Sequence, residues 1–212
     1  MNVKRDSVPG GGFYLLWLVS GLASILLGWI VSWGLLLLAQ AVIGDYIYVN
    51  GVRHITEDYL FSWIFFPLIG LLQGAMQALI LREVRPRTGM WVLVTPVGWI
   101  VAFIFLRGVA EVFFPQGGIP ADTLLSRMLI FSTLGLCIGV AQWLVLRRWV
   151  DRSWVWILFS MVGWALLPIF TGRSFTSVLE LLLIALPPGV VSLLALWLLF
   201  DRWQAIPQAS TP

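Results

Sequence analysis

The chain has 212 residues, of which 60% are hydrophobic and only 11% are charged, and its mean hydropathy is +0.95. Soluble proteins carry about 25% charged residues, so these values exclude a soluble globular domain and predict an all-α, multi-pass membrane protein. The apolar runs are continuous and much longer than the roughly ten-residue alternating segments of a transmembrane β-barrel. The net charge of +3 comes from arginines expected at the membrane surface, and it does not indicate nucleic acid binding.

In chain order, a polar tail over residues 1–11 precedes a single transmembrane domain over residues 12–202, and a second tail covers residues 203–212. The first apolar run, from about Phe13 to Ile43, contains the sequence Ala-Gln-Ala, which has the small-x-small form of a signal peptidase site. The run is much longer than the apolar region of about 7–15 residues found in signal peptides, so we expect a retained, tilted first helix.

Five further helices are expected after a polar segment at residues 44–58. They lie at about residues 59–81, 90–106, 124–146, 154–169 and 178–200. Two short basic turns and two outer loops connect them. The last helix is expected to be interrupted at Pro187, Pro188 and Gly189, because two prolines remove two backbone donors and free the carbonyls four residues earlier. Broken helices of this kind build ion or substrate sites in some transporters, although a simple kink is the alternative.

The basic residues predict the topology. With both ends of the chain and both short turns placed on one side, nine Lys and Arg residues lie on that side and four lie on the other. The acidic residues divide the other way, four against six. Because cytoplasmic loops carry the excess of Lys and Arg, the sequence predicts six spans in the cytoplasmic membrane with both termini inside the cell.

A repeat organises the centre of the chain. Residues 70–99 match residues 135–164 without a gap, with 13 identities in 30 positions, and the full repeat units cover about 60–113 and 125–178. Each copy contains two spans, so the copies are expected to be parallel repeats related by an axis along the membrane normal. Gly28-Trp29 resembles the Gly-Trp pair that ends each copy. This suggests three helix pairs around a pseudo-threefold axis, with the sixth helix as a member that has lost the pattern.

Each copy places two glycines and a glutamine on one helix face. Gly70, Gly74 and Gln77 stand at positions i, i+4 and i+7, which lie within a stripe of about 60°. Glycines one turn apart allow another helix to approach closely. The expected packing glycines of both copies and their partner helices are Gly70, Gly74, Gly98, Gly135, Gly139 and Gly163.

The polar residues on these faces form the candidate site. Gln77 and Gln142 are expected to face protein, and Thr95 and Ser160 occupy matching places on the partner helices. One interpretation is a generic packing seam, in which an interhelical hydrogen bond contributes only about 0.6 kcal/mol. The other is a polar ring around a central site, whose third place is apolar or filled by Ser192. Glu180 is a further candidate, because ionisable residues at membrane depth are often functional.

The chemistry open to an enzyme is limited. Cys137 is the only cysteine and His54 the only histidine, so an internal disulfide and a site with several histidines are excluded. Cys137 falls mid-membrane and His54 in an outer loop, so they do not form a catalytic pair. Neither His-Glu-x-x-His nor Gly-x-Ser-x-Gly occurs in the sequence. We therefore expect no enzyme activity, no catalytic residue, no metal site and no cofactor.

The sequences Gly-Leu-x-x-Gly-x-x-Gln-Trp-Leu-Val-Leu-Arg-Arg (135–148) and Trp-x-Leu-x-x-x-x-Gly-Trp (156–164) resemble a recurring signature of uncharacterised multi-pass membrane proteins of cyanobacteria and other bacteria. The resemblance covers the two repeats, about a third of the chain. The first copy departs from it at Ala78, where the second has Trp143. The resemblance implies a fold and carries no activity or functional residue with it.

Two functions fit these patterns. The leading hypothesis is a non-enzymatic binding, scaffold or accessory subunit. Its Gly/Trp seams would take a membrane protein partner, a second copy of the chain or a hydrophobic small molecule within the bilayer. The alternative is a transporter of a small solute or ion, with a polar site near Gln77, Gln142 and the Pro187-Pro188 break.

Overall fold

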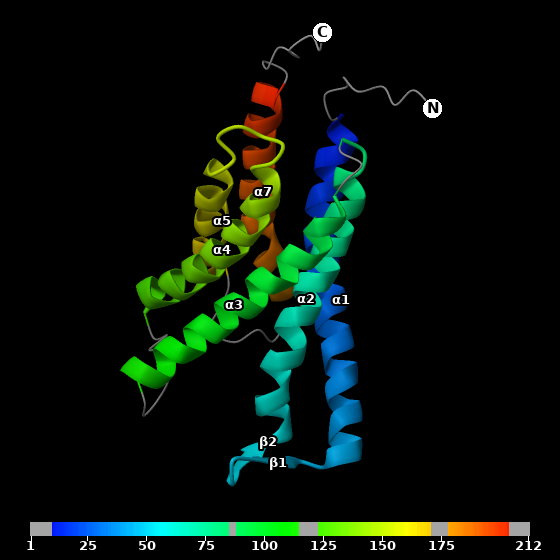
Figure 1. Cartoon of the computed structure of the whole chain (residues 1–212). Helices are drawn as coiled ribbons and strands as arrows, with labels where there is room; N and C mark the ends of the chain where they lie inside the picture. Colours follow the sequence, from blue (N-terminus) through cyan, green and yellow to red (C-terminus); the bar gives the residue numbers. More distant parts are fainter. Residues whose placement is uncertain (1–9, 85–87, 115–122, 171–177, 204–212) are drawn as a thin grey trace.

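The structure is a computed structural model that describes residues 10–84, 88–114, 123–170 and 178–203 (Figure 1). Helices dominate it, and the only sheet among the described residues is a two-stranded hairpin. The elements are α1 (Gly11–Ile43), β1 (Tyr46–Val49), β2 (Val52–Ile55), α2 (Thr56–Leu81), α3 (Gly89–Phe113), α4 (Leu124–Leu146), α5 (Val155–Ala165), α6 (Leu167–Phe170) and α7 (Val178–Trp203).

Four helices among the described residues are long and apolar enough to cross a membrane. They cover Gly11–Ile43, Trp63–Leu81, Gly89–Phe113 and Leu124–Leu146, and two shorter apolar helical stretches cover Val155–Phe170 and Leu183–Leu199. The expected class, an all-α membrane protein, therefore agrees with the structure.

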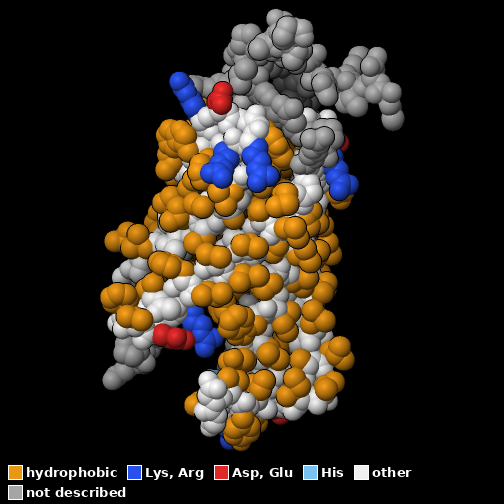
Figure 2. Space-filling model, viewed as in Figure 1, with side chains coloured by type: hydrophobic (Ala, Val, Ile, Leu, Met, Phe, Trp, Pro, Cys, Tyr) orange, Lys and Arg blue, Asp and Glu red, His pale blue; other side chains and the backbone are white. Residues whose placement is uncertain are grey.

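The side chains are distributed as in a protein that lipid surrounds. Leu37 and Leu125 are 61% and 67% exposed, whereas Thr95 and Gln142 are only 0% and 2% exposed. In Figure 2 hydrophobic side chains cover the middle of the visible face, and most of its Lys and Arg side chains gather towards the end at which α1 begins. Because the polar groups turn inward and the apolar groups outward, the middle of the bundle suits a hydrocarbon environment.

Six of the helices form a closed ring. Each of α1, α2, α3, α4, α5 and α7 contacts the next one, and α7 returns to contact α1. The start of α1 and the end of α7 lie at one end of the bundle, together with the α2–α3 and α4–α5 connections; the hairpin lies at the other end (Figure 1). This ring encloses a central axis on which residues from all six segments meet.

A β-hairpin occupies most of the polar segment at residues 44–58, for which no secondary structure was predicted. Asn50 and Gly51 both have positive φ, 50° and 78°, as the two-residue turn of a tight hairpin requires. Tyr46 pairs with Ile55 at the open end, and the Thr56 hydroxyl donates to the Gly44 carbonyl at 2.7 Å to close its base. The Asn-Gly pair between two alternating segments was the signal for this hairpin.

The expected interruption of the last helix is wrong, because α7 continues through Pro187 and Pro188. Proline keeps a helical φ of about −65°, so the helix persists where neighbouring helices support it. Gly163 of α5 supplies such support: a Cβ added there would lie 2.9 Å from the Pro188 Cα. The backbone donors at the two prolines are still missing, so the carbonyls of Leu183 and Ile184 lack their usual helical partners.

Other boundaries differ in detail. The helix expected to end near residue 106 continues to Phe113, and the helix expected over 154–169 divides at Leu166 into α5 and α6. Pro168 accounts for the division, because it removes the backbone donor that the carbonyl of Trp164 would otherwise use.

Candidate functional site

Three fully buried tryptophans meet on the axis of the ring. Trp17 of α1, Trp91 of α3 and Trp156 of α5 are 1%, 0% and 2% exposed. Their ring centroids are 6.3, 6.2 and 6.0 Å apart, with interplanar angles of 66°, 83° and 69°. Edge-to-face contacts of this kind are the favoured arrangement of aromatic pairs. We call these residues the tryptophan triad; the triad fills the axis nearer the end at which α1 begins.

Each indole of the triad donates a hydrogen bond to a polar side chain on a neighbouring helix. Trp91 Nε1 donates to Gln77 Oε1 and Trp156 Nε1 to Gln142 Oε1, and both distances are 3.0 Å. Trp17 Nε1 donates to Ser192 Oγ, also at 3.0 Å. Because an indole N–H can only donate, the oxygens of both amides must face the tryptophans. The orientation of each glutamine is therefore set by chemistry.

The two glutamines also bond to each other. Gln142 Nε2 donates to Gln77 Oε1 at 3.4 Å and to Thr95 Oγ1 at 3.2 Å, and the Thr95 hydroxyl donates to the Trp91 carbonyl at 2.9 Å. Both hydrogens of the Gln142 amide are thereby used. Gln77 is only 4% exposed, yet its Nε2 makes no hydrogen bond within the described residues.

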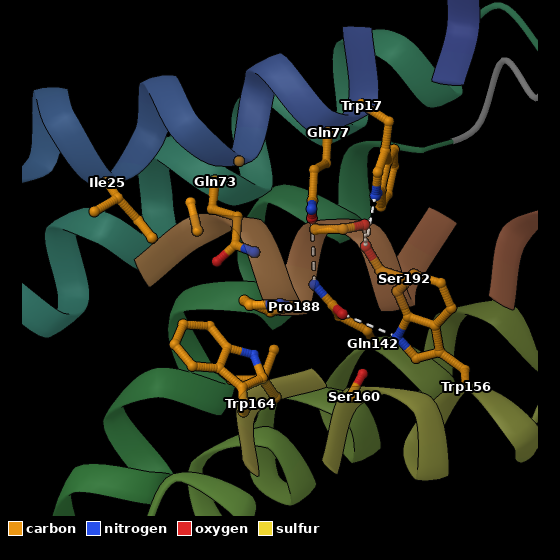
Figure 3. A pocket seen from close by; sticks show the side chains of 14 residues that line it. Trp17, Ile25, Gln73, Gln77, Gln142, Trp156, Ser160, Trp164, Pro188 and Ser192 are labelled. Atoms are coloured by element: carbon orange, nitrogen blue, oxygen red, sulfur yellow. Dashed lines mark hydrogen bonds between the residues drawn. The ribbon is translucent and has the colours of Figure 1, made fainter. Parts of the chain in front are cut away.

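A small cavity lies beside this network (Figure 3). Its volume is about 30 Å³, and it is lined by residues of α1, α2, α4, α5 and α7. Its polar lining comes from Gln73, Gln77, Gln142, Ser160 and Ser192. A cavity must have at least about 10–15 Å³ open to the centre of a water molecule to hold one water, so this cavity has room for one or two. Pockets for drug-sized ligands measure about 300–1,000 Å³, so a larger molecule does not fit here without rearrangement.

Most of the predicted polar residues come together at this place. Gln77, Gln142 and Thr95 form one hydrogen-bonded group, and Ser160 lines the cavity without a hydrogen bond of its own hydroxyl among the described residues. The side chain of Glu180 lies outside the described residues. Ser192, the residue named for the third place of the expected polar ring, accepts a hydrogen bond from Trp17.

Sequence reasoning missed two parts of the site. Gln73 lies one turn before Gln77 on the same face, and its Oε1 accepts from Trp99 Nε1 at 3.1 Å. The tryptophan triad was also missed, although Trp91 and Trp156 are identities of the repeat, because Trp17 belongs to a helix outside the ungapped match. The available signal was that each copy of the repeat contains a tryptophan, whose indole can only donate, 14 residues after the glutamine that accepts from it.

All six predicted packing glycines face other helices of the same chain. A Cβ added at Gly70 would lie 2.5 Å from Pro96 Cα, and one added at Gly135 would lie 2.5 Å from the Ser160 carbonyl oxygen. The same construction gives 3.0 Å at Gly74, 2.8 Å at Gly98, 2.9 Å at Gly139 and 2.9 Å at Gly163, each from an atom of a neighbouring helix. These seams close within the chain.

The sixth helical segment keeps the spacing that it was expected to have lost. Ala185, Gly189 and Ser192 of α7 stand at i, i+4 and i+7, as Gly135, Gly139 and Gln142 do on α4. Gly189 faces α1, because a Cβ added there would lie 2.8 Å from Leu18 Cδ1. Alanine and serine replace glycine and glutamine, so the small-small-polar pattern survives although the residue identities do not.

The match of Gly28-Trp29 to the later Gly-Trp pairs is out of register by one turn. Trp17 is the residue that joins the triad, and Ser24 follows it by seven positions, as Gly98 follows Trp91. Ser24 Oγ contacts Met76 Sδ of α2 at 3.9 Å. Trp29 instead packs on Trp33 of its own helix, with ring centroids 6.0 Å apart.

No family model, curated protein or solved structure matches the chain. Among the described residues, no group of three or more His, Cys, Asp or Glu side chains is placed to hold a metal ion. The functional argument therefore depends on the axial network and its cavity.

Proposed function

We propose that the protein is a non-enzymatic membrane protein with six spans, built as three helix pairs around a pseudo-threefold axis, with both termini in the cytoplasm. The triad supports the threefold arrangement, because α1, α3 and α5 each contribute one tryptophan that donates to α7, α2 and α4 respectively. The gathering of Lys and Arg towards the end at which α1 begins supports the orientation (Figure 2).

We propose further that this protein transports a small solute or ion through the axial cavity. The observation that carries this proposal is the amide of Gln77, which is buried at membrane depth with no hydrogen-bond partner for its Nε2 among the described residues. This nitrogen does not belong to the fully enclosed atoms that lack a partner, and its residue lines the cavity, so a molecule in the cavity can reach it. A ligand in the adjoining cavity satisfies it.

The alternative role, a scaffold or accessory subunit, receives less support from the packing. The glycine seams that would have received a partner are filled by helices of the same chain. A membrane protein partner, a second copy or a hydrophobic molecule would have to bind the lipid-facing surface. This surface is covered by scattered Leu, Val and Ile side chains that lipid alone explains.

Access to the cavity tests the transport proposal. In a Cys137→Ser background, Gln77→Cys places the only thiol at the cavity, and Ala78→Cys places it one position away on a residue that is 1% exposed and does not line the cavity. The probe is hydrogen peroxide, a neutral molecule close to water in size, which oxidises a thiol to a sulfenic acid. We expect hydrogen peroxide added to sealed vesicles to block maleimide labelling of the first thiol, measured after denaturation, much faster than that of the second. Equal rates would refute a solute path through the cavity.

A double substitution tests the role of the amides. Gln77→Leu with Gln142→Leu keeps the side-chain volumes similar and removes the polar lining. We expect folding to persist, as judged by circular dichroism, and solute passage to be lost from proteoliposomes. Leu79→Ala, on a residue that is 60% exposed on the lipid side of the same helix, serves as the control and should leave passage unchanged. Passage that survives the double substitution would show that the network only packs.

A further inference from the structure

We propose that the axial cavity selects a neutral, water-sized molecule that both donates and accepts hydrogen bonds, and that it excludes ions. This inference rests on the proposed transport function, because it names the class of solute taken by the same site. Four features of the cavity support it: its free donors, its free acceptor, its lack of charge and its size.

The free donors lie on α2. Gln77 Nε2 has no partner among the described residues, and its orientation is fixed by the donation from Trp91 to its oxygen. Gln73 repeats this arrangement one turn away: its oxygen accepts from Trp99, and its Nε2 makes no hydrogen bond in the part of the chain that the structure describes. Both residues line the cavity. Two amide nitrogens therefore offer hydrogens to whatever occupies it.

The free acceptor lies on α5. The Ser160 hydroxyl lines the cavity, can both donate and accept, and makes no hydrogen bond among the described residues. A polar group inside a membrane must be satisfied by protein or by water in a cavity, and the cavity adjoins this hydroxyl.

The cavity offers no compensation for charge. None of its fourteen lining residues is ionisable. An ion held there would be buried without a counter-charge, which is the most unfavourable placement of a charge in a membrane protein. A cation would also find few ligands, because Gln77 Oε1 already accepts two hydrogen bonds and Gln142 Oε1 accepts one.

The size of the cavity and the polarity of its lining both match a water molecule. The volume of about 30 Å³ suits one or two water molecules, and both free donors and the Ser160 hydroxyl line it. A molecule that accepts from Gln77 and donates to the Ser160 hydroxyl satisfies both groups together. Water has this chemistry, and other small neutral hydrides share it.

Two measurements on the full-length protein test the inference. The first is an experimental map of the purified protein at a resolution that shows ordered waters. We expect an oxygen within hydrogen-bond distance of Gln77 Nε2, and its loss in Gln77→Leu. An empty cavity in the unsubstituted protein, or a monoatomic ion in it, would overturn the inference.

The second measurement is the permeability of proteoliposomes, with water as one probe and K⁺ and Cl⁻ as the others. Osmotic shrinkage should be faster than in protein-free vesicles, should return to their rate with Gln77→Leu, and should be unchanged with Leu79→Ala. Passage of K⁺ or Cl⁻ that Gln77→Leu abolishes would overturn the neutral selectivity and leave the transport proposal standing. An ordered water in the map without any passage would refute the transport proposal and leave the binding inference standing.

Discussion

Gly135→Ala is expected to destabilise the bundle, although alanine is the better helix former. Gly135 of α4 lies against α5, where an added Cβ would be 2.5 Å from the Ser160 carbonyl oxygen and 3.0 Å from Met161 Cα. Both of these atoms belong to backbone, so no flexible side chain can move out of the way. Gly34 of α1 is the matched control, because an added Cβ meets nothing within 4 Å there.

The magnitude follows from the geometry. An ordinary Cβ contact begins at 3.4 Å, so α4 and α5 must separate by about 0.9 Å at this point. Over-packing of this kind costs about 1–3 kcal/mol. The helix propensity of alanine returns up to about 1 kcal/mol. The net loss is about 1–2 kcal/mol for Gly135→Ala, whereas Gly34→Ala should be neutral or slightly stabilising.

Thermal unfolding in mild detergent measures this difference. Cys137, the only cysteine, is partly buried, so a fluorogenic maleimide reports its exposure on unfolding. For a chain of this size, 1 kcal/mol corresponds to about 2–4 °C, so the Tm of Gly135→Ala should fall by about 2–8 °C. Circular dichroism gives an independent Tm. A Gly135→Ala protein as stable as the Gly34→Ala control would refute the close packing of α4 on α5.

Three smaller effects are expected. Trp91→Phe leaves Gln77 Oε1 with only the 3.4 Å bond from the second glutamine, and should cost about 1–2 kcal/mol by thermal unfolding; an unchanged Tm would argue against the indole hydrogen bond. Thr123→Ala removes the side chain that caps α4 and should cost about 1 kcal/mol, which Thr123→Ser should restore. Arg107→Gln breaks the pair with Glu111, whose side chains are 43% and 65% exposed, and should change stability by less than about 1 kcal/mol; a larger loss would indicate that a partner or lipid buries the pair.

The sequence predicted the parts of the site that depend on spacing within one helix or between two helices joined by a short turn. Gln77 and Trp91 are 14 residues apart, and Gln142 and Trp156 are also 14 apart, because the same short basic turn joins the helices of both copies. An ungapped comparison therefore found the pair of copies. The helical stripe of glycines and glutamine then placed these residues against protein, and the structure brings Gln77 and Gln142 within hydrogen-bond distance.

The pairing of Trp17 with Ser192 escaped because the outer connections differ in length. Trp91 follows Trp17 by 74 positions, but Trp156 follows Trp91 by only 65, and Ser192 follows Gln142 by 50. An insertion such as the hairpin shifts the register without disturbing the helices that flank it. The substitution of serine for glutamine hid the pattern further. Which residue of α1 reaches the triad depends on the tertiary packing of the ring, and spacing along one helix does not contain that information.

The closure of the ring has a consequence for how the protein is made. The hydrogen bond from Trp17 to Ser192 joins residues 175 positions apart, and α7 leaves the ribosome after the other described helices. Until α7 inserts, the axial amides lack one of their walls and face lipid or an insertion factor, at a cost that hydrocarbon does not offset. A chain truncated before Val178 should therefore be retained by the insertion machinery or degraded. The stability of the earlier helices in the bilayer thus depends on the insertion of α7.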